Sequence, residues 1–115
     1  MSIRFINKGS GGKAVLPNGI YFGNVTSTFT NFDMTNFDTS NMTTFYQMFY
    51  GCSNLISINF DNIDTKNIEN VSNMFNGCTS LTSISLNGLN LEKVSTMSGM
   101  FQRMYCFNIS NFWKY

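Results

Sequence analysis

The sequence MFYGC at residues 48–52 returns as MFNGC at residues 74–78, and a weaker copy, MFQRM, follows at residues 100–104. The interval between the copies is 26 residues both times. Apolar residues elsewhere keep the same interval, for example Phe37, Ile63 and Leu89. A constant interval of this size is typical of repeat proteins, in which each repeat buries its apolar side against its neighbours.

The sequence predicts two elements in each repeat. Residues 42–49 carry apolar side chains at the spacing of one helix face, which favours a short helix. Asn41 stands where an N-cap belongs, and Gly51 follows the last apolar residue, where a left-handed residue ends a helix at low cost. Residues 55–60 alternate apolar and polar side chains, which is the pattern of a short, half-buried strand. Residues 81–86 repeat that pattern.

Residues at equivalent positions of successive repeats form what we call columns, and the apolar columns predict the core. Its expected members are Met48, Phe49, Met74, Phe75, Met100, Phe101, Leu55, Leu81, Cys52 and Cys78. The last two occupy one column, so adjacent strand spacing would bring their thiols close enough for a disulfide. We favour a stacked pair of buried thiols, because cysteine is among the most frequently buried residues. The chain has three cysteines without CxxC spacing, which argues against a zinc site.

The stretch FDTSNM at residues 37–42, followed by MFYGC and then SNL at residues 53–55, resembles the BspA-like leucine-rich repeat family. The second unit is similar, with IDTKNI at residues 63–68 before MFNGC. The third loses the Gly-Cys pair to Arg103-Met104 and is similar to a degenerate capping repeat. The resemblance implies a parallel-stranded solenoid with binding or surface-exposed roles, and it implies no catalytic residues.

These observations predict an α/β repeat fold, a short leucine-rich-repeat-type solenoid of about three coils with parallel strands and short helices. We expect the solenoid over residues 29–112 and a C-terminal tail over residues 113–115. Residues 1–28 are expected to form a strand-like arm with a Gly-rich linker and a hairpin turn at residues 17–19. The Gly-rich run lacks the spacing and the hydroxyl residue of a phosphate-binding loop.

Composition argues against several functions. Seven Lys and Arg balance six Asp and Glu, so the chain has no strong field for nucleic acid or anionic lipid. Charged residues make up only 11% of the chain, and there is no His, the commonest general base and a frequent metal ligand. We therefore predict no catalytic residue, no cofactor, no metal site, no nucleic-acid partner and no membrane association. The sequence also has no recognisable signal peptide and no apolar stretch of membrane-spanning length.

Aromatic and terminal residues suggest protein partners. Tyrosine is enriched at interfaces, and repeat arrays have open ends that must be capped or joined. The arm could also dock on a neighbouring subunit. The candidate interaction residues are Ile3, Phe5, Tyr46, Tyr50, Tyr105, Trp113 and Tyr115.

The sequence thus favours a non-enzymatic structural or binding module with protein partners, such as other subunits of an assembly. One expected location is a phage particle, in which the chain would be an accessory or decoration component. The alternative is a bacterial cell-surface module for adhesion or protein binding. An enzyme without a recognisable motif is a distant third.

Overall fold

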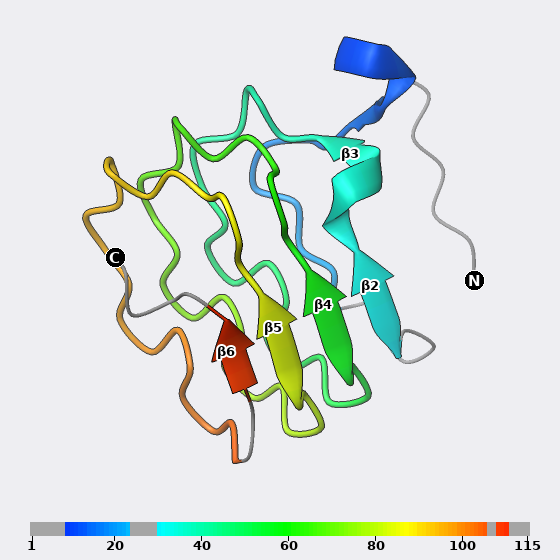
Figure 1. Cartoon of the computed structure of the whole chain (residues 1–115). Helices are drawn as coiled ribbons and strands as arrows, with labels where there is room; N and C mark the ends of the chain where they lie inside the picture. Colours follow the sequence, from blue (N-terminus) through cyan, green and yellow to red (C-terminus); the bar gives the residue numbers. More distant parts are fainter. Residues whose placement is uncertain (1–8, 24–29, 106–107, 111–115) are drawn as a thin grey trace.

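The structure is a computed structural model that describes residues 9–23, 30–105 and 108–110. Its larger sheet has four strands in the order β2 (Asn31–Asp33), β4 (Ser57–Asn59), β5 (Ser83–Ser85) and β6 (Asn108–Ser110). A smaller sheet joins β1 (Ala14–Val15) to β3 (Phe37–Asp38), and every pairing in both sheets is parallel. Two 3₁₀ turns, η1 (Ser10–Gly12) and η3 (Met34–Asn36), are the helical segments of the described chain. Figure 1 shows the larger sheet on one side and long turn segments opposite it.

The strand register follows the repeat of the sequence. Ile58 in β4 pairs with Phe32 in β2 and with Ile84 in β5, so each step along the sheet equals one 26-residue interval. The last step is shorter, because Ile84 pairs with Ile109 rather than with residue 110. The strands predicted within residues 55–60 and 81–86 are therefore present, and the third repeat has lost one residue.

The predicted helices are wrong. Segment 42–52 is a series of tight turns in which Met48 N–H donates to Phe45 O at 3.1 Å. Other backbone N–H groups of this segment donate to the next repeat instead. Phe45 N–H donates to Asn70 O at 2.8 Å, and Phe49 N–H donates to Met74 O at 2.9 Å. The second repeat bonds to the third in the same way. Backbone groups that a helix would pair internally are thus used to join the repeats.

Backbone angles explain why no helix forms there. Gln47 has φ +54° and Gly51 has φ +73°, and neither value belongs to a right-handed helix. Asn41 therefore caps no helix. The expected α/β solenoid with short helices is corrected to two small parallel sheets joined by turns and bends.

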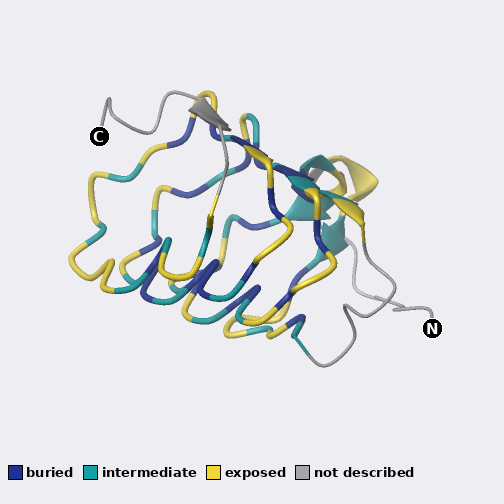
Figure 2. Cartoon of the chain, turned by 90° about the horizontal axis from the view of Figure 1, so that it is seen from below, coloured by how far each residue is buried: buried dark blue, intermediate teal, exposed yellow. Residues whose placement is uncertain are grey.

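The core is an apolar column that runs through the stacked repeats. Phe22, Phe49, Phe75 and Phe101 stack with ring centroids 5.2–6.1 Å apart and with interplanar angles of 8–19°. Phe60 contacts Phe49 and Phe75 edge-on from the sheet side. Such pairs add about 0.5–1.5 kcal/mol each to the free energy of burial. Figure 2 shows buried and exposed residues alternating along the turns.

The N-terminal residues extend this stack instead of forming the expected hairpin. Strand β1 runs parallel to β3, and Phe22 N–H donates to Met48 O at 2.8 Å. Asn18 bonds Thr43 twice, through its Nδ2 to Oγ1 at 2.9 Å and its Oδ1 to the backbone N–H at 3.1 Å. Residues 14–23 therefore pack on the first repeat as a further, irregular repeat. The turn expected at Pro17 is present, since Ile20 N–H donates to Pro17 O.

Candidate interaction surface and apolar pocket

Three tyrosines expose much of their side chains on the described surface. Tyr46 is 45% exposed, Tyr105 is 77% exposed and Tyr21, which the sequence analysis did not single out, is 41% exposed. Tyr50 is half-buried. The other predicted interaction residues, Ile3, Phe5, Trp113 and Tyr115, lie outside the described residues.

Tyr50 belongs to a row of polar contacts that crosses three repeats. Arg103 lies in the third repeat and donates from Nε to Asn76 Oδ1 at 3.0 Å and from Nη2 to the Tyr50 hydroxyl at 3.1 Å. Its guanidinium carbon also lies 6.0 Å from the centre of the Tyr50 ring, within range of a cation–π contact. At the other end of the row, the Tyr21 hydroxyl donates to Tyr50 O at 3.4 Å. We call Tyr21, Tyr50, Asn76 and Arg103 the tyrosine–arginine row.

Arg103 was not predicted from the sequence as a member of this row. The residue occupies the column of Gly51 and Gly77, and it shares their left-handed backbone with φ +60°. A non-glycine residue in that conformation is uncommon. An arginine in a glycine column was therefore the signal that could have drawn attention to it. Of the predicted residues, Tyr46 lies on the same turn segment as Tyr50, and Tyr105 follows Arg103 by two residues.

A polar hollow lies over the larger sheet. It has a volume of about 380 Å³ and is lined by side chains of β2, β4 and β5 together with Asp61. Its groups are bonded to one another, since the Ser57 hydroxyl donates to Asn31 Oδ1 and the Ser85 hydroxyl donates to Asp61 Oδ1 at 2.6 Å. These two bonds link side chains of neighbouring repeats along the sheet.

Asp33 and Asp38 accept hydrogen bonds within local turns. Asp33 accepts hydrogen bonds from the Thr35 hydroxyl at 2.6 Å and the Thr35 N–H at 2.9 Å, which lower the pKa of Asp33 below its usual 3.8. Asp38 bonds Ser40 in the same manner. Within the part of the chain that the structure describes, no three His, Cys, Asp or Glu side chains gather closely enough to hold a metal ion.

The residues predicted as the repeat core lie inside the molecule, with Phe101 only half-buried. Cys52 and Cys78 are both fully buried and are not joined in a disulfide. The Cys78 thiol donates to Phe49 O at 3.0 Å. Its hydrogen bond with Cys52, followed by burial, raises the pKa of Cys78 well above the usual value of 9.0. The raised pKa of Cys78 disfavours its thiolate, which is the form of cysteine that acts as a nucleophile or a metal ligand.

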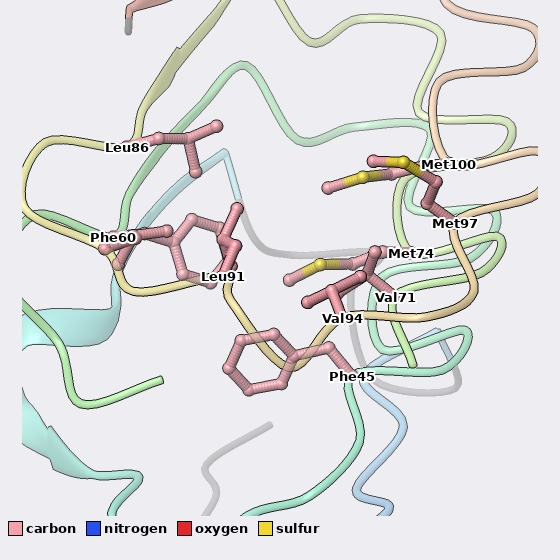
Figure 3. Close-up of a pocket in the computed structure, with 10 residues that line it drawn as sticks. Phe45, Phe60, Val71, Met74, Leu86, Leu91, Val94, Met97 and Met100 are labelled. Atoms are coloured by element: carbon pink, nitrogen blue, oxygen red, sulfur yellow. The ribbon is translucent and has the colours of Figure 1, made fainter. Parts of the chain in front are cut away.

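An apolar pocket lies between the second and third repeats, with a volume of about 90 Å³. Figure 3 shows its two sides: Phe60, Leu86 and Leu91 on one, and Met74, Met97 and Met100 opposite them. Every lining side chain is apolar; the remaining ones are Phe45, Val71, Leu89 and Val94. Met97 is 48% exposed and is the lining residue that reaches furthest to the surface. This pocket was not predicted from the sequence.

Comparison with known proteins gives one match. A family model described as "Mycoplasma protein of unknown function, DUF285" matches residues 20–114. This match begins before the predicted repeat region and includes Phe22, which the structure places at one end of the phenylalanine stack. No curated protein and no solved structure matches the chain. In the described chain, no helical segment is long and apolar enough to cross a membrane.

Proposed function

We propose that this chain, which belongs to the DUF285 family, is a non-enzymatic module that binds another protein through its exposed tyrosines. The observation that carries the proposal is the tyrosine–arginine row, with Tyr46 exposed on the same turn segment as Tyr50. Tyr and Arg are among the residues enriched at protein interfaces, and they are frequent among the few residues that supply most of the binding energy.

The row favours a protein partner for a further reason. Its central side chains are already held in place, because Asn76 and the Tyr50 hydroxyl both bond the Arg103 guanidinium. Ordering a free arginine side chain costs about 0.5–1.5 kcal/mol on binding. That cost is reduced here because the side chain is fixed before the partner arrives.

The relationship to BspA-like repeat proteins is part of this proposal. It rests on the two copies of the F/I-D-T-x-N-M/I phrase at residues 37–42 and 63–68. The family description names a bacterial genus, which favours a bacterial protein-binding role over a component of a phage particle.

Site-specific photocrosslinking in the native cells tests the proposal. A photoreactive phenylalanine is introduced at Tyr46 or at Tyr105, and each crosslinked protein is identified. The matched control is the same residue at Ile56, which is 44% exposed but precedes strand β4. We expect a common protein to be captured from Tyr46 and Tyr105 and not from Ile56.

The captured protein is then purified and its affinity for the full chain is measured. Arg103→Ala and Tyr105→Ser are each expected to weaken binding by roughly tenfold, the loss typical of an important interface residue. If all three positions capture the same proteins, or if neither variant weakens binding, the tyrosine surface is not the interface.

A further inference from the structure

We propose that the apolar pocket binds a small uncharged molecule that carries a single aromatic ring. The pocket lies inside the stack, between the second and third repeats, and is separate from the tyrosine–arginine row. The proposal is therefore independent of the protein-binding function.

The pocket exists because two aromatic rings are lost between successive repeats. In the first repeat, Phe45 and Phe60 face each other across the interior with ring centroids 6.1 Å apart. The same columns hold Val71 and Leu86 one repeat later. Val has four fewer side-chain carbons than Phe, and Leu has three fewer. The second repeat thus lacks seven carbon atoms at this place, which is the number in toluene.

The chemistry of the lining selects the ligand. All ten lining residues are apolar, so the pocket offers no side-chain partner for a hydrogen bond. An apolar cavity of this kind does not hold water well, and one of about 150 Å³ in another protein stays dry and binds benzene or xenon. The present volume of about 90 Å³ is smaller than that, which limits a ligand to a single ring. Charged or strongly polar ligands would lose their hydration without compensation.

Access to the pocket favours a free molecule over the side chain of a partner. The lining residues that reach the surface come from the third repeat, with Met97 the most exposed of them and Leu91 and Val94 partly exposed. The side chain of Met97 lies beside that of Met100 and extends towards the pocket (Figure 3). Methionine is unbranched and adapts its shape readily, so Met97 can move aside to admit a small ring.

Toluene is the probe for the test. The full chain is labelled with ¹³C at the methionine methyl groups, and toluene is added while the methyl spectrum is recorded. We expect saturable shifts of the Met74, Met97 and Met100 signals. The Met34 signal, from a buried methionine outside the pocket, is the internal control and is expected to stay in place.

Two variants restore the missing rings. Leu86→Phe and Val71→Phe are each expected to weaken toluene binding by at least roughly tenfold, since pockets of this type discriminate single methylene groups by 10–200-fold. Ile56→Phe adds a ring outside the pocket and should leave binding unchanged. The wild-type methyl spectrum decides the matter even if both pocket variants fail to fold.

Three outcomes would overturn the proposal. The first is the absence of saturable methyl shifts in the wild-type chain. The second is binding that appears only after residues 111–115 are deleted, which would make the chain's own end the occupant. The third is N-acetylphenylalanine amide binding more tightly than toluene, which would assign the pocket to a side chain of a protein partner.

Discussion

Cys52 and Cys78 show how the stacking of repeats brings equivalent residues into contact. Because they share a column, the parallel stacking brings them together, and the Cys78 thiol bonds both Cys52 and Phe49 O. The interpretation of the pair as buried thiols is confirmed, because both cysteines are buried and no disulfide joins them. Burial and hydrogen bonding both favour the protonated thiol over the thiolate.

This preference predicts a stability that falls in alkaline solution. The folded-state pKa of Cys78 is raised above 9.0, so its contribution is fully present below pH 9 and is lost as pH rises beyond it, where only the unfolded thiol ionises. Urea unfolding from pH 7 to about pH 10 measures the effect. We expect Cys78→Ala to reduce the alkaline loss of stability relative to wild type, whereas Thr79→Ala, at the exposed neighbour, should not. A stability difference between wild type and Cys78→Ala that is the same at every pH would contradict the argument.

The binding surface could be predicted only in part from single residues. Tyr46 and Tyr105 are exposed, as the sequence suggested, because each lies off the apolar columns. Arg103 was not predicted, because its contact with Tyr50 spans 53 residues and two repeats. The pocket was also missed, since it depends on the summed volume of facing columns rather than on any one residue.

At the scale of elements, the strands were predictable and the turns were not. Ile58 and Ile84 alternate with polar neighbours, and this period of two has one structural interpretation. The apolar residues at 42, 45, 48 and 49 fit a helix face, but successive three-residue turns bury the same positions. Local periodicity does not reveal that alternate N–H groups bond the next repeat, so it could not separate the two structures.

A substitution at Gln47 distinguishes the turns from a helix, because the two structures predict opposite changes in the free energy of unfolding. Its φ of +54° is left-handed, which is strained for a residue with a side chain and free of strain for glycine. Gln47→Gly is therefore expected to raise the free energy of unfolding by up to about 1 kcal/mol. In a helix the same change would lower it by a similar amount, because glycine is a poor helix former. Urea unfolding distinguishes the two, and Gln47→Ala, which a helix would favour, is the control and should not stabilise the protein.

At the scale of the whole molecule, the stack begins earlier than the sequence repeat. Residues 1–28 were expected to form a separate arm because they lie outside the matched repeat pattern. Ala14 pairs with Phe37 at an interval of 23 residues, and the Phe22 ring stacks on that of Phe49 at an interval of 27, so neither interval is the regular 26. A search at one constant interval misses such a repeat. The structure therefore has a capped N-terminal end, with Phe22 covering Phe49.

This cap predicts a large cost for a substitution far from the recognisable repeats. Phe22 is fully buried and contacts both Phe49 and Phe32, so Phe22→Ala should lower the free energy of unfolding by about 3–5 kcal/mol. Phe101→Ala, at the other end of the stack, should cost less because that ring is only half-buried. Tyr21→Ala is the neighbouring control and should cost less than about 1 kcal/mol, since this side chain is largely exposed and its hydrogen bond is long. Urea unfolding of the full chain orders the three variants. If Phe22→Ala and Tyr21→Ala lower the free energy of unfolding equally little, residues 14–23 are an independent arm. The predicted order would instead show that they belong to the stack as its additional N-terminal repeat.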